Sequence, residues 1–318
     1  MKHESAPTDT VCVILAGGRG KRMSSLDTHK TCFPVAGIPA IVRALDTHKK
    51  AGISRFMVVV GQMADQVMST VSSKHPDVTF VYQSNPRGTG HAAAVAVEAL
   101  AAQSYTGNVV IVMGDQVTSP EVVRRLLRRV AKSKADMVLT TLPKRAQSSA
   151  GRLVFNNDGK PAGIVEVPDI SRAREEGALL DVGGLKLSAK EVEAGSNQVN
   201  ISMYAFRFPR LLEALRQLKP DNAQSELYLT DTVEYIAGEG EVELMSLSEP
   251  TELMAFNSPD ELLAIEEVVR ARERLPRVLV SQEIVLGPRV QKTVGEWLHI
   301  LRTRPRELRD ELHKIYGG

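Results

Sequence analysis

A glycine-rich, basic segment near the start of the chain has the residue types of an anion-binding site. It runs Leu15-Ala16-Gly17-Gly18-Arg19-Gly20-Lys21-Arg22-Met23 and follows an apolar stretch, Val11–Leu15. Glycines let backbone amides approach a phosphate closely, and the basic side chains add positive charge. Two familiar phosphate loops do not fit: Arg22 stands where a Walker loop needs serine or threonine, and Met23 where a dinucleotide fingerprint needs glycine. We predict a phosphate loop of another type; the simpler interpretation is a glycine turn beside solvated basic side chains.

Several residues farther along the chain could contact a nucleotide. Lys30 follows the glycine segment and could neutralise charge on a transferred phosphoryl group, although an isolated lysine is equally well a solvated side chain. Gln83 offers both a donor and an acceptor to a nucleobase edge. Gly88-Thr89-Gly90 opens a predicted helix whose free amides could bind an anion or a base. His91 in the same helix is interpreted as a capping or core histidine.

Asp115 ends a predicted buried strand in the sequence Met113-Gly114-Asp115. An acid at the carboxyl end of a parallel strand lies where such sheets bind ligands, and its carboxylate could hold Mg²⁺. Capping of the next helix is an equally simple role for this side chain. The DxD motif of many glycosyltransferases is absent from the sequence, which argues against that class.

Apolar runs alternate with helical patterns over the first 143 residues. Strands are expected at Val11–Leu15, Arg55–Val60, Val78–Tyr82, Val109–Met113 and Asp136–Thr141, and helices at Pro39–Ala51, Met63–Ser72, Gly90–Ala102 and Pro120–Lys132. The strands are apolar throughout, which is typical of strands buried on both faces. This alternation predicts a parallel sheet with right-handed crossovers and a ligand site beyond the carboxyl ends of its strands.

The pattern changes after about Pro143. A hairpin is predicted from Gly151–Phe155 and Pro161–Val167, followed over 168–198 by a helix and an insertion. Further strands are expected at Val199–Phe206 and Glu241–Leu247, and helices at Pro209–Gln217, Thr230–Ala237 and Pro259–Arg272. Val290–Tyr316 is amphipathic and predicts two helical segments that separate near Arg302–Pro305.

The composition disfavours several other classes of protein. Of the 318 residues, 43% are hydrophobic and 25% charged, which is too apolar for a disordered chain. A net charge of 40 − 38 = +2 disfavours a dedicated nucleic-acid-binding protein. No apolar run approaches the ~20 residues of a membrane span, and Met1–Thr10 lacks a secretory signal. Cys12 and Cys32 provide neither a disulfide framework nor a zinc site, so we expect a cytoplasmic protein without a membrane or nucleic-acid partner.

Taken together, the motifs resemble the sugar-1-phosphate nucleotidylyltransferase superfamily, and most narrowly the uridylyltransferase domain of bacterial N-acetylglucosamine-1-phosphate uridylyltransferases. The resemblance covers residues 11–275. The motifs are the segment from Leu15 to Met23, Lys30, Pro34-Val35-Ala36-Gly37-Ile38-Pro39, Gln83, Gly88-Thr89-Gly90-His91, Gly114-Asp115, Gly151-Arg152-Leu153, Gly163-Ile164-Val165-Glu166, Asn200, the run from Asn222 to Asp231, and Asn257.

The resemblance implies a fold and a set of site residues. The fold is α/β, a Rossmann-like mixed and mostly parallel sheet flanked by helices. The nucleotide would be contacted by Leu15, Ala16, Gly17, Gly18, Gln83, Gly88, Thr89 and Gly114. Arg22 and Lys30 would be catalytic, Asp115 and Asn257 would hold the cofactor Mg²⁺, and the sugar pocket would be lined by Gly151, Glu166 and Asn200. The implied substrates are UTP, or a related NTP such as dTTP, and a sugar-1-phosphate such as N-acetylglucosamine-1-phosphate.

Some positions depart from the pattern of this family. His29 replaces a proline, Ile38 a lysine and Ser202 a glycine, Gln116-Val117 replaces Val-Pro, and 34 residues separate Glu166 from Asn200, which is longer than expected. Ser202 and the longer separation border the expected sugar pocket, so they leave the identity of the sugar open. A non-catalytic nucleotide-sugar sensor on the same fold is the alternative function.

We expect a flexible N-terminus over 1–10, a nucleotidylyltransferase domain over 11–275 and a helical extension over 276–318. The apolar stripe of that extension, which includes Trp297, would pack on the catalytic domain; a contact with a second subunit or a further domain is the alternative. Ile284-Val285-Leu286-Gly287 resembles one hexapeptide of a left-handed β-helix, but no series follows. We therefore expect no acetyltransferase activity from this chain.

Overall fold

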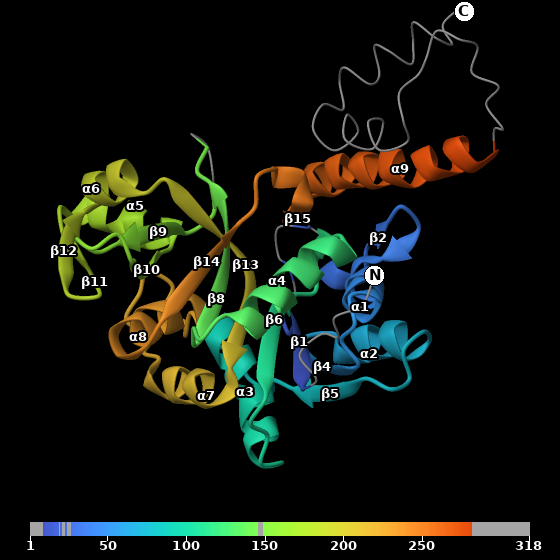
Figure 1. Cartoon of the computed structure of the whole chain (residues 1–318), viewed down its shortest axis with the longest axis horizontal. Coiled ribbons are helices and arrows are strands. Elements are labelled where there is room, and N and C mark those ends of the chain that lie inside the picture. Colours follow the sequence, from blue (N-terminus) through green and yellow to red (C-terminus); the bar gives the residue numbers. More distant parts are fainter. Residues whose placement is uncertain (1–8, 19, 21–22, 24–26, 146–148, 282–318) are drawn as a thin grey trace, which may run out of the picture. The chain divides into compact units, whose positions relative to one another are not determined.

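A nine-stranded mixed sheet forms the centre of the computed structural model, which describes residues 9–18, 20, 23, 27–145 and 149–281 (Figure 1). Its main path has the order β10-β9-β13-β6-β1-β4-β5, with β8 beside β13 and β14 beside β8. The strands are β1 (Thr10–Ala16), β4 (Arg55–Val60), β5 (Thr79–Tyr82), β6 (Asn108–Met113), β8 (Met137–Pro143), β9 (Arg152–Phe155), β10 (Pro161–Val165), β13 (Gln198–Arg207) and β14 (Val242–Ser246).

The direction of the strands confirms the predicted mixed, mostly parallel sheet. Strands β5, β4, β1 and β6 are parallel neighbours, and β14 is parallel to β8. Strand β13 is antiparallel to β6, β8 and β9, and β10 is antiparallel to β9. Within this sheet, β13 and β10 are therefore antiparallel to the other seven strands.

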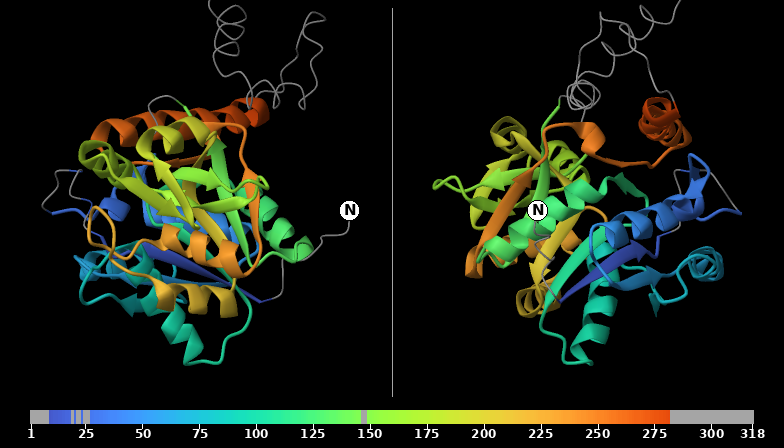
Figure 2. Two further views of the ribbon diagram at one scale, coloured as in Figure 1. Left: turned by 90° about the vertical axis from the view of Figure 1, so that its left-hand side faces the viewer. Right: turned by 45° about the vertical axis from the view of Figure 1, so that its right-hand side comes forward.

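Helices cover both faces of the sheet (Figure 2). On one face, α1 (Ala40–Lys50), α2 (Ala64–Ser72) and α4 (Pro120–Lys132) pack on strand residues such as Cys12 and Ile14. On the other, α3 (Thr89–Ala101), α7 (Phe208–Gln217) and α8 (Thr232–Glu239) pack on alternate residues such as Val11 and Val13. Strand β1 is buried along its whole length, which explains why its sequence is apolar throughout.

A smaller layer is built on the β9–β10 hairpin. It contains α5 (Val167–Glu176), the hairpin of β11 (Leu179–Val182) and β12 (Leu185–Ser188), and α6 (Ala189–Gly195). These elements share an apolar cluster of their own, which includes Val154, Ile170 and Val192. The insertion expected within 168–198 is therefore a hairpin followed by a capped helix, in which Ser188 and Glu191 form a capping box.

Three differences from the predicted elements concern short or terminal segments. The ladders of β2 (Pro34–Val35) with β3 (Ile38–Pro39) and of β7 (Gln116–Thr118) with β15 (Leu253–Ala255) were not predicted, because two or three residues are too short to show a period. Helix α9 (Pro259–Ser281) continues beyond the predicted end at Arg272. The other predicted ends agree within two residues.

The chain divides into two compact units, residues 1–269 and 270–318. The amphipathic segment Val290–Tyr316 and most of the expected flexible N-terminus lie outside the described residues. Within the part of the chain that the structure describes, no helix is long and apolar enough to cross a membrane.

Candidate active site

Three side chains from distant parts of the sequence meet beyond the carboxyl ends of β1 and β6. The Lys30 ammonium forms an ion pair with the Asp115 carboxylate and donates a hydrogen bond to Asn257 Oδ1 at 2.9 Å. The same Nζ lies 5.7 Å from the centroid of the Phe256 ring. The side chains of Lys30 and Asp115 are 14% and 11% exposed, so little water screens the pair. The predicted catalytic lysine is therefore in contact with both predicted metal ligands.

A short antiparallel ribbon explains how Asp115 and Asn257 come together. Asp115 immediately precedes β7, and Asn257 follows β15 by two residues. In this ribbon Gln116 is paired with Ala255. The register places the start of one strand beside the end of the other, so the two predicted metal ligands are neighbours despite their separation in sequence.

Lys30 begins a single 3-10 turn, Lys30–Cys32, that His29 caps. His29 is fully buried; its Nδ1 accepts a hydrogen bond from the Thr31 backbone at 3.3 Å, and its own backbone N–H donates to Gln66 Oε1 at 2.5 Å. Burial lowers the pKa of the His29 imidazole, so the ring is neutral at pH 7. A histidine thus supplies a polar cap in the place where the family pattern has proline.

The described part of the glycine-rich segment lies against Lys30 and Gln83. A Cβ on Gly17 would collide with the side-chain oxygen of Gln83, and one on Gly20, whose φ is +71°, would approach the aliphatic chain of Lys30 to 2.5–3.0 Å. Gly18 is exposed, with nothing within 4 Å of an added Cβ. The conformation and packing at position 20 therefore require glycine, whereas a larger residue at position 17 would displace the end of the Gln83 side chain. Predicted Arg22, together with Arg19 and Lys21, lies outside the described residues.

The other predicted nucleotide contacts at this edge are also neighbours of the loop. Leu15 and Ala16 end β1, and the Gly114 N–H donates to the Leu15 carbonyl at 3.0 Å. A Cβ on Gly114 would come within 2.9 Å of the Thr31 side chain. The Gly114–Asp115 turn is therefore packed between the end of β1 and the turn that begins with Lys30.

Gln83 is buried after β5, and His91 holds it. The Gln83 side chain is 3% exposed, and its Nε2 lies 3.0 Å from His91 Nδ1 and 3.4 Å from the Gly88 carbonyl. His91 is partly exposed on the first turn of α3, and it neither caps the helix nor lies in the core. The interpretation of His91 from sequence is wrong, because the structure makes it the partner of the predicted base-contacting glutamine.

Gly88 and Thr89 are bound to the segment that precedes α8. Gly88 has φ +103°, and a Cβ there would approach the Leu227 carbonyl to 2.5 Å. The Thr89 hydroxyl oxygen accepts a hydrogen bond from the Leu229 N–H at 3.1 Å. The conformation that glycine permits at this helix N-terminus therefore allows a close backbone approach.

The predicted sugar-pocket residues form a second group. The Asn200 N–H donates to the Gly151 carbonyl at 2.9 Å, and a Cβ on Gly151 would lie 3.1 Å from the Glu166 carboxyl group. The Asn200 amide donates to the Tyr204 hydroxyl at 2.8 Å and accepts from the Ser202 N–H at 2.9 Å. Gly151, Glu166 and Asn200 are thus neighbours, as the resemblance implies.

Gln116 connects the two groups and was not predicted as a site residue. Its side-chain amide donates to the carbonyl oxygens of Ile201 at 2.8 Å and Ser202 at 2.9 Å, within the irregular part of β13. It directly follows Asp115 in the chain, so it ties the turn that holds the predicted metal ligand to the strand that holds Asn200. The only signal in the sequence was its departure from the family pattern.

Carboxyl groups gather next to the second group. Burial, followed by the charges of Asp169, Glu234 and Glu166, raises the pKa of Asp231 to about 7. Burial also raises the pKa of Glu166, although a hydrogen bond with Thr230 opposes the shift. This part of the site is therefore acidic, and its Asp231 carboxyl group titrates near pH 7.

The raised pKa of Asp231 predicts a pH-dependent stability. Between pH ~4 and ~7 the folded chain binds a proton that the unfolded chain releases, so the free energy of unfolding falls as pH rises through this window, by at most ~1.4 kcal/mol per pH unit. Asp231→Asn lacks this titrating group, so we expect its free energy of unfolding, measured with urea, to rise relative to that of the wild type as the pH increases from 4.5 to 8. The same substitution at exposed Asp158 is the control. Parallel pH profiles for the wild type and Asp231→Asn would contradict the assignment.

The side-chain oxygens of Asp115 and Asn257, beside Lys30, are suitable ligands for a magnesium ion. A carboxylate and an amide oxygen already surround one cationic nitrogen, and oxygen is the ligand type that Mg²⁺ prefers. Among the described residues there is no group of three or more His, Cys, Asp or Glu side chains suited to a metal. Two protein oxygens match the usual Mg²⁺ site, in which phosphates and water supply the remaining ligands.

The α/β fold and a glycine loop beside a lysine and an acid define a nucleotide-binding protein, and comparisons with known proteins give the family. Residues 12–232 match the MobA-like NTP transferase domain. The chain is 32% identical over 226 residues to the bifunctional protein GlmU of Geobacter metallireducens, which covers 71% of this chain and 43% of that protein. It is 31% identical over 278 residues to the bifunctional protein GlmU of Chromohalobacter salexigens, which covers 87% of this chain and 55% of that protein.

A solved structure, assigned as a glucose-1-phosphate thymidylyltransferase from Bacillus anthracis in complex with sucrose, has the same fold. Its TM-score is 0.62 at 20% identity, covering 82% of this chain and 96% of the other. The chain therefore belongs to the MobA-like NTP transferase family. It is a member of the sugar-1-phosphate nucleotidylyltransferase superfamily, as its motifs indicate. It spans about half the length of the curated relatives it matches.

Proposed function

We propose that this chain transfers a uridylyl group from UTP to a sugar-1-phosphate in a Mg²⁺-dependent reaction that releases pyrophosphate. The observation that carries the proposal is the convergence of Lys30, Asp115 and Asn257 beside the glycine loop. These are the residues that the resemblance assigns to catalysis and to the metal. The sugar we favour is N-acetylglucosamine-1-phosphate, and we place the reaction in the cytoplasm.

The chemistry asks for alignment and charge neutralisation. A phosphate oxygen of the sugar-1-phosphate attacks the α-phosphorus of UTP as pyrophosphate departs. The nucleophile is already an anion at pH 7, so no general base is needed. The partly buried ammonium of Lys30 stabilises negative charge on the phosphates, and low exposure strengthens that effect.

Asp115 and Asn257 would hold the Mg²⁺ ion, which supplies Lewis acidity and orients the phosphates when it is bound. The loop Leu15–Gly18 would surround the nucleotide, and Gln83 with Gly88 would contact its base. The group of Gly151, Glu166 and Asn200 would receive the sugar. Gln116 would hold the two halves of the site in a fixed relative position, because its side-chain amide donates hydrogen bonds to the carbonyl oxygens of Ile201 and Ser202.

A pyrophosphate-release assay tests the proposal. The purified chain is incubated with Mg²⁺, UTP and a panel of sugar-1-phosphates, with dTTP as a second nucleotide. Release that requires both substrates, together with a new nucleotide sugar, supports the proposal. Nucleotide-sugar binding without turnover on any member of the panel would favour the alternative, a non-catalytic sensor.

We expect UTP to be preferred over GTP by ~10²-fold or more in kcat/KM. A site whose buried polar groups pair one base leaves them unsatisfied with another, and such losses are large. Gln83 is the buried group concerned, and His91 fixes its orientation. Initial rates with each NTP at a fixed sugar-1-phosphate concentration measure the ratio. Equal rates with UTP and GTP would remove the role proposed for Gln83.

A further inference from the structure

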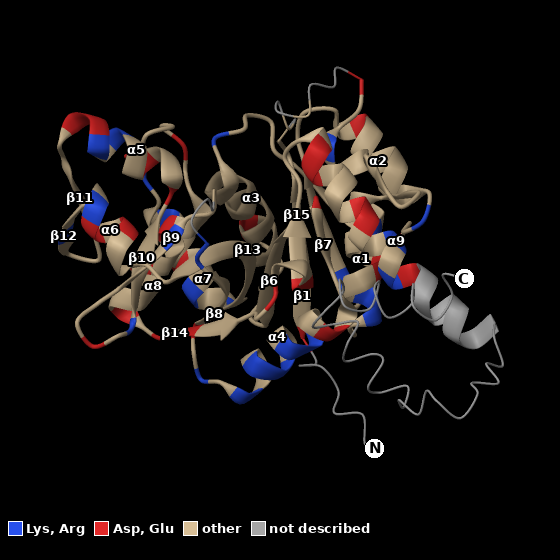
Figure 3. Cartoon of the chain, turned by 90° about the horizontal axis from the view of Figure 1, so that it is seen from above, with Lys and Arg blue, Asp and Glu red and all other residues tan. Residues whose placement is uncertain are grey.

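Helix α4 has a strongly basic outer face. Its inner side chains are buried in the core, among them Val123 and Leu126. Along its outer side run five cations, at the spacing of successive helical turns: Arg124, Arg125, Arg128, Arg129 and Lys132. Figure 3 shows this concentration of Lys and Arg on α4. The chain as a whole carries a net charge of only +2, so the patch does not follow from a basic composition.

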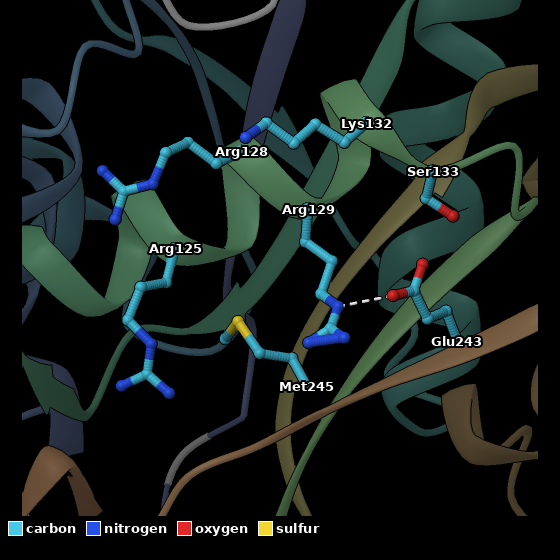
Figure 4. A pocket seen from close by; sticks show the side chains of 7 residues that line it. All are labelled: Arg125, Arg128, Arg129, Lys132, Ser133, Glu243 and Met245. Carbon is cyan, nitrogen blue, oxygen red and sulfur yellow. Dashed lines mark hydrogen bonds and ion pairs between the residues drawn. The ribbon is translucent and has the colours of Figure 1, made fainter.

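Part of this face forms a pocket between the second half of α4 and β14 (Figure 4). The pocket has a volume of about 470 Å³, within the usual range of small-ligand sites. It is lined by Arg125, Arg128, Arg129, Lys132, Ser133, Glu243 and Met245. Four cations therefore face one carboxylate across it. We call this the α4–β14 pocket.

The arginines of the pocket are paired with carboxylates that an anion could replace. Arg125 contacts Glu252 at 2.5 Å, Arg128 contacts Glu121 at 2.6 Å, and Arg129 contacts Glu243 at 2.5 Å. The three guanidinium side chains are 38–47% exposed and their carboxylate partners 22–53%, so water reaches each pair and its contribution to stability is modest. The Lys132 side chain has no hydrogen bond or ion pair with any described residue. A bound anion would thus compete with solvent-accessible ion pairs and meet one unpaired ammonium group.

The α4–β14 pocket is separate from the candidate active site. Arg207 links the carbonyl oxygens of Val130 and Ser133, at the end of α4, to Asn108, the first residue of β6. Asp115 follows the other end of this six-residue strand. At ~3.3 Å per residue, about 20 Å of β6 lies between Asp115 and this end of the pocket, and about 10 Å of the β7–β15 ribbon lies between Asp115 and Glu252, the partner of Arg125 at the other end.

We propose that the α4–β14 pocket binds a small molecule that carries two or more phosphate groups. Guanidinium groups match phosphate oxygens in a bidentate manner, and several of them in one concave site select multiply charged ligands. Favourable interaction with the helix dipole would explain cations in the last turn, such as Arg129 and Lys132. It would not explain the arginines earlier in the helix or the presence of a pocket beside them. Glu121 and Glu252 flank the basic side chains, and they oppose an extended polyanion such as a nucleic acid.

Calorimetric titration with inorganic tripolyphosphate, at low salt and without divalent metal, tests this proposal. Neutralising Arg125, Arg128 and Lys132 together to glutamine is expected to weaken binding at least tenfold. Arg124→Gln, on the same helix but outside the pocket, is the matched control and should bind like the wild type. Glu243→Gln removes the only carboxylate of the pocket lining, so it should tighten binding several-fold, a gain that partial unfolding cannot produce.

Three results would overturn the proposal. The first is unchanged affinity in the triple variant. The second is loss of all binding in Lys30→Ala, which would place the anion in the active site. The third is a preference of the patch for single-stranded DNA over tripolyphosphate at equal phosphate concentration. The binding measurement does not depend on nucleotidyl transfer, so failure of either proposal leaves the other standing.

Discussion

Replacing Asp115 by alanine is expected to abolish nucleotidyl transfer, with kcat lowered by at least ~10²–10³-fold. Loss of one key electrostatic group in an active site costs about 3–4 kcal/mol, and Asp115 is proposed both to hold Mg²⁺ and to pair with Lys30. The side chain lies at the end of a buried strand rather than inside the core, so the fold should persist. Steady-state rates at saturating Mg²⁺ and circular dichroism measure the two effects.

Two further variants make this prediction specific. Asp115→Asn keeps the shape of the side chain and removes its charge, so it should lose activity nearly as completely. Asp77→Ala disrupts an ion pair with Lys49 that is exposed on the surface, with side chains 41% and 56% exposed, and it should be active. Near-normal kcat in Asp115→Ala at saturating Mg²⁺ would refute the assignment.

Replacing Lys30 by alanine is expected to lower kcat, by ~10²-fold or more, and to raise the KM for UTP much less. The charge of Lys30 should matter most when negative charge redistributes over the phosphates in the transition state, and such an interaction changes kcat rather than binding alone. Its Nζ touches the oxygens of both Asp115 and Asn257, so it is directly at the proposed site of transfer.

Lys49→Ala is the matched control for Lys30, because it removes a lysine from an exposed pair with Asp77. Thermal unfolding of both variants separates a loss of activity from a loss of structure. If Lys30→Ala raised KM while kcat stayed constant, Lys30 would contribute uniform binding and would be a positioning residue.

The sequence alone determined the elements of this protein and most members of its candidate site. The continuous apolar run Arg55–Val60 and the helical period of Pro120–Lys132 are strong signals, so the ends of both elements were predicted correctly. The glycine segment after the first strand was visible in the residue types themselves, and the structure shows that Gly17 lies against the Gln83 side chain. The resemblance then assigned Lys30, Asp115 and Asn257 their roles.

Only the tertiary structure decided how these residues meet. The β7–β15 ribbon that joins Asp115 to Asn257 is three residues long in each strand, too short for any pattern, and its stability comes from the surrounding fold. The hydrogen bonds from Gln83 to His91 and from Gln116 to β13 join residues whose pairing no sequence period indicates. The α4–β14 pocket likewise needs β14 beside the basic face of α4, because sequence shows which residues share a helix face but not what lies opposite them.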